Sequence, residues 1–154
     1  MTKSVELINQ LFEEKAEYWS IDDIKIDYLS ERIYLKLESV IQQEIQKTYI
    51  TFKEVLSFYV HQEADIETFR LNERKYDDPN LLSEISYHPN GFGHIKIESL
   101  EKELKEIESI NSKTNFYFQV NNKDCFFIEA NAICINDEEF NNLITESKSL
   151  KKPY

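Results

Sequence analysis

A histidine and two acidic residues alternate near the middle of the chain, as His61, Glu63 and Asp65. On an extended strand these three side chains share one face, an arrangement that metal ligands sometimes adopt. The spacing matches no motif with a metal-binding mechanism behind it, and no second cluster of ligands accompanies it. We therefore expect a solvated loop or strand edge here, and neither a metal site nor a cofactor.

Sequence signals for other kinds of catalysis are missing. The chain has no nucleophile elbow, and with only Gly91 and Gly93 it cannot form a glycine-rich phosphate loop. The carboxylate pairs Asp22-Asp23 and Asp77-Asp78 are adjacent, and adjacent side chains on a strand point to opposite faces. These pairs are therefore expected to be solvated rather than paired for acid–base work. We expect no enzymatic activity.

The two cysteines, Cys125 and Cys134, lie on one predicted strand. An extended chain separates them by roughly 30 Å, so they cannot form a disulfide with each other. We interpret both as reduced, small, half-buried side chains.

Composition and charge narrow the classes of partner. The 154 residues are 41% hydrophobic and 13% aromatic, which favours one globular domain over residues 1–154. The formal net charge is −11, so free nucleic acid and anionic membrane surfaces are unlikely ligands. A basic protein partner fits this charge, although acidity for solubility alone is the other interpretation. The polar N-terminus and the lack of a long apolar run predict a cytoplasmic protein.

A hairpin over Phe116–Ile135 is the strongest structural signal. Aromatic and β-branched residues alternate on two arms, and Asn and Asp residues between them favour a turn. Ile133 and Ile135 fall on the opposite parity to Phe126 and Ile128. Either both faces are buried there, or an extra residue near position 130 makes a bulge.

The remaining pattern predicts a helix at each end of a series of strands. Apolar residues at helical spacing predict an amphipathic N-terminal helix within residues 1–19, and the stripe that begins at Leu100 predicts another near 100–110. A cap at Asn136 followed by acidic residues predicts a short helix over 137–147, before a basic tail at 148–154. The sheet is expected within residues 20–136.

Alternating segments predict the strands of that sheet. Residues from Asp23 to Leu37 form one hairpin, and strands follow at Thr48–Phe52 and Val55–Val60, the latter apolar enough for a central position. Leu81–Tyr87 and Gly93–Glu98 flank a His-Pro-Asn-Gly turn and should pair with each other. Tight turns imply antiparallel pairing, so we predict an α+β fold with a curved or sandwich-like antiparallel sheet of about six to eight strands.

Two motifs resemble a known family. Trp19-Ser20-Ile21-Asp22-Asp23-x-Lys25-Ile26 opens the sheet, and Ile50-Thr51-Phe52-x-x-Val55 follows. They resemble small YxiG-like proteins of the Bacillus type, and immunity proteins of polymorphic-toxin loci that share a W-x-F-H-D-x-x-I-like opening. This chain carries Ile21-Asp22 where that opening has Phe-His. The resemblance covers residues 19–60, with a looser match around Phe126–Ile135.

The resemblance implies a non-enzymatic cytoplasmic protein that binds and blocks a cognate toxin, such as a basic nuclease domain. Exposed carboxylates and an aromatic anchor are then the candidate contacts: Asp22, Asp23, Glu63, Asp65, Asp77, Asp78 and Trp19. Two other hypotheses remain open. One is a small-ligand-binding or enzymatic β-domain with a pocket between sheet and helix, and the other is a structural or regulatory dimer.

Overall fold

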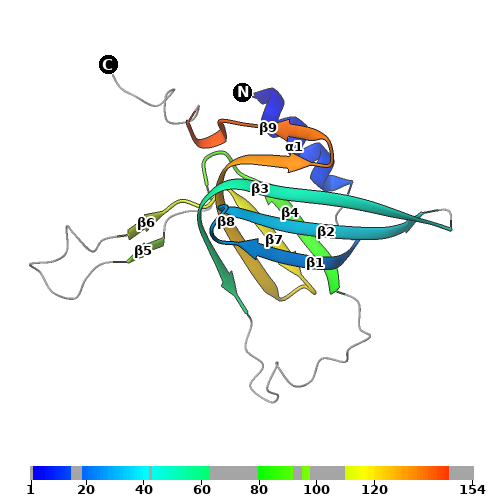
Figure 1. The fold of residues 1–154 in the computed structure, drawn as a ribbon. Coiled ribbons are helices and arrows are strands. Elements are labelled where there is room, and N and C mark those ends of the chain that lie inside the picture. The colour runs from blue at the N-terminus through cyan, green and yellow to red at the C-terminus, as the bar shows by residue number, and fades with distance from the viewer. Residues whose placement is uncertain are drawn as a thin grey trace, which may run out of the picture.

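The structure is a computed structural model that describes residues 2–14, 19–41, 43–62, 80–91, 95–97 and 110–145. It contains a seven-stranded antiparallel sheet, a separate two-stranded sheet, an N-terminal helix and a helical turn at 143–145 (Figure 1). The predicted α+β fold is confirmed. The elements are α1 Thr2–Glu13, β1 Ser20–Asp27, β2 Arg32–Ile41, β3 Glu44–His61, β4 Asn80–Tyr87, β5 Ile95–Ile97, β6 Ile110–Ser112, β7 Phe116–Val120, β8 Asp124–Ile135 and β9 Glu138–Phe140.

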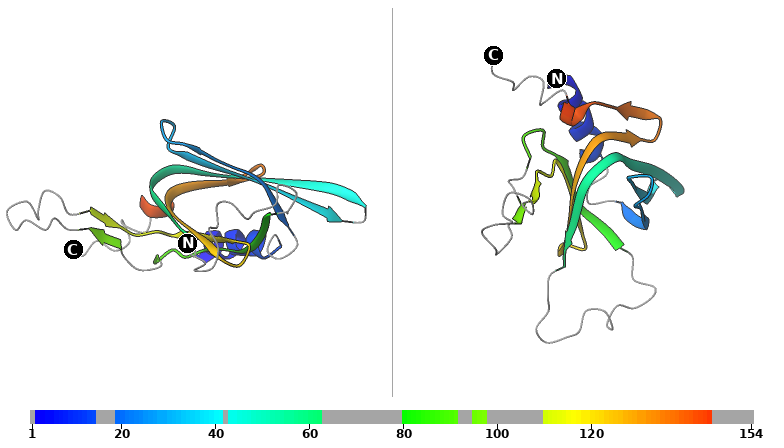
Figure 2. Two further views of the ribbon diagram at one scale, coloured as in Figure 1. Left: turned by 90° about the horizontal axis from the view of Figure 1, so that it is seen from below. Right: turned by 60° about the vertical axis from the view of Figure 1, so that its left-hand side comes forward.

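The large sheet folds back on itself into two layers. Its strand order is β3-β2-β1-β4-β7-β8-β9, and β3 also pairs with β8, which closes a ring of six strands. We call β1, β2, the first half of β3, the end of β8 and β9 the first layer. The second layer holds β4, β7, the start of β8 and the second half of β3 (Figures 1 and 2). The two layers meet at corners, where a strand bends and passes from one layer into the other.

β3 turns the corner at Glu54, whose φ of 50° is left-handed. The predicted strands Thr48–Phe52 and Val55–Val60 are therefore one long strand with a bend. Before the bend, Phe52 is fully buried and pairs with Ile133, whereas beyond it the pairing with β8 shifts by one residue between Val55 and Ser57. The bulge lies on β3, and β8 pairs without interruption from 130 to 135.

On β8 the apolar residues change from even to odd positions because both faces of the strand are buried there. This is the first of the two predicted alternatives. Ala132 and Ile133 are consecutive and only 2% and 1% exposed. The expected hairpin of β7 and β8 is confirmed. Its turn places Asn121 and Asn122 at φ of 55° and 59°, a conformation that asparagine tolerates better than most residues.

The core lies between the two layers, with α1 at one end. Phe116 is its centre, because its ring contacts Phe12 of α1, Phe52 of β3 and Tyr87 of β4 at centroid distances of 6.3, 5.2 and 4.7 Å. These edge-to-face and offset contacts are favourable geometries for aromatic rings. The apolar face of α1 supplies Ile8 and Phe12, both fully buried, so the predicted stripe of this helix packs into the core.

The predicted pairing of Leu81–Tyr87 with Gly93–Glu98 is wrong. β4 pairs with β7, opposing Tyr87 with Phe116 and Ile85 with Phe118, while β5 pairs with β6 in the two-stranded sheet. The turn itself is present, since the Gly91 amide donates to the His88 carbonyl at 2.9 Å. Pairing with β7 buries the aromatic residues of both strands in the core, which a local hairpin would not achieve.

The C-terminal helix begins later than predicted. Glu138–Phe140 forms β9, which pairs with the end of β8 in a hairpin, and the helical turn starts only at Leu143. Asn136 adopts a φ of 53° and exchanges two hydrogen bonds with the backbone of Tyr49, so it acts as a hairpin-turn residue rather than as a helix cap. The predicted helix near 100–110 and the basic tail lie outside the described residues, apart from Ile110 in β6.

Candidate protein-binding groove

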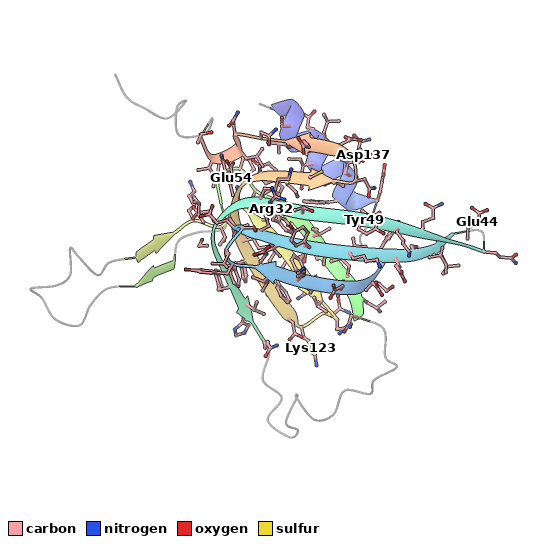
Figure 3. The ribbon with its side chains drawn as sticks, viewed as in Figure 1. Arg32, Glu44, Tyr49, Glu54, Lys123 and Asp137 are labelled. Carbon is pink, nitrogen blue, oxygen red and sulfur yellow. The ribbon has the colours of Figure 1, made fainter. Side chains whose placement is uncertain are left out.

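A groove of about 510 Å³ lies between the β1–β2 turn and the second half of β3. Figure 3 labels Arg32, which lines the groove, and Glu54, at which β3 bends just before the groove residue Val55. Its lining is mainly apolar, with three charged residues among it. The lining residues are Ile26, Asp27, Tyr28, Leu29, Glu31, Arg32, Ile33, Val55, Leu56, Ser57 and Phe58.

The β1–β2 turn forms one wall of the groove. The Asp27 carboxylate accepts a hydrogen bond from the Ser30 amide at 3.2 Å, which closes the turn, and Glu31 follows with a φ of 55°. The Glu31 carbonyl then accepts a hydrogen bond from the Val55 amide at 3.0 Å. This bond fixes the turn against β3, and it leaves Tyr28 and Leu29 82% and 91% exposed.

β3 forms the other wall, with side chains that face the core. Phe58 lies directly opposite Ile128 and Val60 opposite Phe126, so all four share one face of the second layer. Ile128 is buried, whereas Phe58 and Val60 are 41% and 38% exposed. The groove is thus an open end of the core, where the described part of the first layer does not extend over the second.

The edge of β3 beside the groove pairs with no described strand. β2 ends its pairing at Ile33 opposite Phe52, and β8 occupies only the other edge from Val55 to His61. The sequence predicted a central position for Val55–Val60. Among the described strands this segment has instead one neighbour and lies at the edge of its layer.

The rim of the groove carries charge of both signs. Hydrogen bonds from the side chain and backbone of Ser30 lower the pKa of Asp27 below its ordinary value, so this carboxylate is ionised at neutral pH. Glu31 adds a second carboxylate and Arg32 a guanidinium. The rim therefore offers ionic contacts around an apolar floor, as protein-binding surfaces do.

A family model described as YxiG-like protein matches residues 8–140, a span that includes both walls of the groove. The chain belongs to the YxiG-like family. Among curated proteins, no sequence matches it. No helix among the described residues of this YxiG-like chain is long and apolar enough to cross a membrane.

The acidic residues predicted from the sequence are only partly placed. In this YxiG-like protein Asp22 and Asp23 are exposed on β1, the strand that leads into the groove, and the β1–β2 register shifts around Asp22. The Asp22 carboxylate lies 3.0 Å from the Lys36 ammonium, and this contact raises the pKa of Lys36. The other four predicted carboxylates, Glu63, Asp65, Asp77 and Asp78, lie outside the described residues.

Trp19 belongs to the core rather than to the surface. It is 3% exposed, and its indole nitrogen donates to the Glu14 carbonyl at 3.1 Å. A buried ring held in this way does not offer the exposed anchor that the sequence suggested. Among the residues that the structure describes, the exposed aromatic residue nearest to Trp19 in sequence is Tyr28, on the turn that lines the groove.

Within the described ranges, no group of three or more histidine, cysteine, aspartate or glutamate side chains could hold a metal ion. His61 is exposed at the end of β3, and its predicted companions lie outside those ranges. Cys125 and Cys134 are both free thiols. The Cys125 sulfur lies 3.4 Å from the Tyr117 hydroxyl, whose pKa is raised by burial, so that hydroxyl is neutral at neutral pH.

Sequence reasoning missed the groove, because its walls come from two segments that are separated along the chain. One signal was available: Tyr28 and Leu29 are large apolar residues in a tight turn, where polar residues are usual. Exposed apolar side chains that gather in one place often mark an interaction site.

Proposed function

We propose that this YxiG-like protein is a non-enzymatic binding protein that neutralises a cognate bacterial toxin by direct contact in the cytoplasm. One observation carries the proposal: apolar side chains gather in an open groove beside the carboxylates of Asp27 and Glu31. Leu56 and Phe58 on one wall face Tyr28 and Leu29 on the other, and all four are exposed. Binding of a partner that covers these side chains would be favoured by the removal of their apolar surface from water.

The charge of the chain supports a basic partner. A formal net charge of −11 speeds encounter with a cationic surface and disfavours anionic ligands. A toxin that cleaves nucleic acid carries a basic cleft for phosphates, and an acidic protein that covers this cleft would block it. The exposed carboxylates Asp22 and Asp23 extend the acidic surface from the groove along β1.

The volume of the groove also falls within the range of small-ligand sites, roughly 300 to 1,000 Å³. Arg32 among apolar neighbours would suit a ligand with an acidic head and an apolar body. This second candidate differs in its test, because it predicts binding by the isolated protein without any macromolecular partner.

Co-expression of the chain with the product of the adjacent gene, followed by pull-down and a toxicity-rescue assay, tests the proposed function. We expect a complex that weakens as salt rises and that restores growth. Glu31→Lys, in the groove, should weaken the complex about tenfold. Asp137→Lys reverses the charge of another exposed carboxylate, on the β8–β9 turn (Figure 3), and should leave affinity unchanged. If the two proteins form no complex and growth is not restored, the proposal is refuted.

A further inference from the structure

We infer that the partner enters the groove as an extended, basic segment that pairs with the edge of β3 along Leu56–His61 and adds a strand to the second layer. The inference rests on the proposed function, and it specifies how the partner binds. It commits to one occupant: a strand of another protein in which apolar and basic residues alternate.

The first support is the backbone of β3. Beyond Val55 no described strand lies on the side of β3 that β2 occupies earlier, although the segment reads in sequence as an interior strand. An extended segment of about six residues, roughly 20 Å long, would complete this edge. Strand addition of this kind gains affinity from main-chain hydrogen bonds.

The second support is the sequence of this edge, which contains neither lysine nor proline. Natural sheet edges often carry lysine or proline, which discourage another strand from pairing there. The segment Leu56–His61 instead has the sequence Leu-Ser-Phe-Tyr-Val-His. Elsewhere asparagine side chains bond to edge backbone groups. Asn9 bonds to Tyr87 at the end of β4, and Asn121 accepts from the Leu81 amide at 2.8 Å.

The third support is the pattern of side chains along the edge. Leu56, Phe58 and Val60 are all exposed, and Phe58 and Val60 share the core-facing side of the sheet. A partner strand places every second side chain over this side, where apolar residues would fill the groove against them. Its other side chains point to the outer face.

Charge decides between a foreign segment and a second copy of this chain. Carboxylates flank the edge on both sides. Across the groove Asp27 and Glu31 outnumber the single guanidinium of Arg32, and Glu129 lies on β8 opposite Ser57. Pairing of two copies would bring together two chains of net charge −11, which repel each other. A basic segment meets complementary charge on either side.

The test uses the full ¹⁵N-labelled chain and a synthetic peptide of about ten residues in which lysine and valine alternate. We expect saturable changes in amide resonances confined to Leu56–His61 and the β1–β2 turn. A peptide methylated on alternate backbone nitrogens, which cannot donate along one edge, should bind about tenfold more weakly. An acidic peptide of alternating glutamate and valine should not bind.

Phe58→Lys places a charge in the groove and should weaken the peptide about tenfold. Val40→Lys makes the same change at a residue that is 71% exposed on the β2–β3 hairpin and should leave affinity within about twofold. Leu56→Lys, at a 60% exposed position, is a second groove variant should Phe58→Lys unfold the protein.

No binding of the basic peptide, equal binding of the acidic or methylated peptide, or equal effects of Phe58→Lys and Val40→Lys would each overturn the inference. A dimer in sedimentation that Phe58→Lys dissociates would also overturn it, because a second copy would then occupy the edge. If Phe58→Lys leaves the affinity for the toxin unchanged, pairing at the edge of β3 is refuted and the proposed function stands. Absence of any toxin complex refutes the proposed function, while the peptide experiment still reports on the edge.

Discussion

The side-chain amide of Asn9 replaces a neighbouring strand at Tyr87. Its nitrogen donates to the Tyr87 carbonyl and its oxygen accepts from the Tyr87 amide, both at 3.0 Å. Asn9 lies on α1 and Tyr87 ends β4, so one side chain joins the helix to the sheet. The fold uses the same device in the core, where Asn115 exchanges two hydrogen bonds with the backbone of Ala130.

Asn9→Ala should destabilise the protein by about 2 kcal/mol, because two partly buried backbone groups of Tyr87 lose their partner. Gln10→Ala changes the next residue of the helix, which is exposed, and should alter stability by less than about 0.5 kcal/mol. Urea unfolding followed by circular dichroism measures both. Equal values for the two variants would contradict a structural role for the Asn9 amide.

Gly91→Ala should cost about 1 to 3 kcal/mol, because the φ of 79° at this position disfavours any side chain. An added Cβ would also lie 2.7 Å from Cγ of Lys113 and 3.1 Å from the Thr114 carbonyl oxygen. A double-mutant cycle with Lys113→Ala separates these two causes. We expect the cost of Gly91→Ala to fall in the Lys113→Ala background, and a cost that stays the same would rule out the Lys113 side chain as its cause.

Phe116→Ala should destabilise the protein by about 3 to 5 kcal/mol, since it removes a fully buried ring that contacts α1, β3 and β4. Phe127→Ala removes a half-buried ring that stacks on Tyr59 at 4.5 Å on the outer face of the second layer. Its cost should be smaller, about 1 to 2 kcal/mol. The order of the two values in urea unfolding checks where the core lies.

The Lys53–Glu139 ion pair makes stability depend on pH in acid. The two groups lie 2.8 Å apart, and the hydrogen bond from Lys53 lowers the pKa of Glu139 below its ordinary value. A lowered folded-state pKa contributes stability that is present above the unfolded pKa and is lost as pH falls through the folded pKa.

Glu139→Gln should therefore reduce the loss of stability between about pH 5 and pH 3, with a small effect because both groups contact solvent. Thermal unfolding at a series of pH values measures it, and added salt should diminish the difference. Glu138→Gln is the matched control, since it changes an exposed glutamate of the same strand. The same acid response in Glu139→Gln and wild type would contradict the contribution of the pair.

Local sequence patterns were sufficient for the elements that pair with near neighbours. The β1–β2 hairpin and the β7–β8 hairpin alternate cleanly and carry turn residues between their arms. Interior and edge strands were not distinguishable, because Val55–Val60 is apolar on both faces for two different reasons. Phe58 faces the core, whereas Tyr59 stacks on Phe127 on the outer face.

Pairing between distant segments was the part that sequence could not supply. The turn at His88–Gly91 suggested a hairpin, yet β4 pairs with Phe116–Val120 further along the chain. At the other end, Asn136 serves equally well as a helix cap and as a left-handed turn residue. Its contact with Tyr49 decides between the two, and that contact joins residues 87 positions apart.

The shared strands β3 and β8 also determine how the molecule comes apart. Neither layer is complete without β3 and β8, because each of these strands contributes one half to each layer. A fragment that stops before β8 would therefore lack strand pairing in both layers. The described body should therefore unfold as one cooperative unit, and its refolding should be slow, because the defining contact of β3 with β8 must close a very long loop of chain.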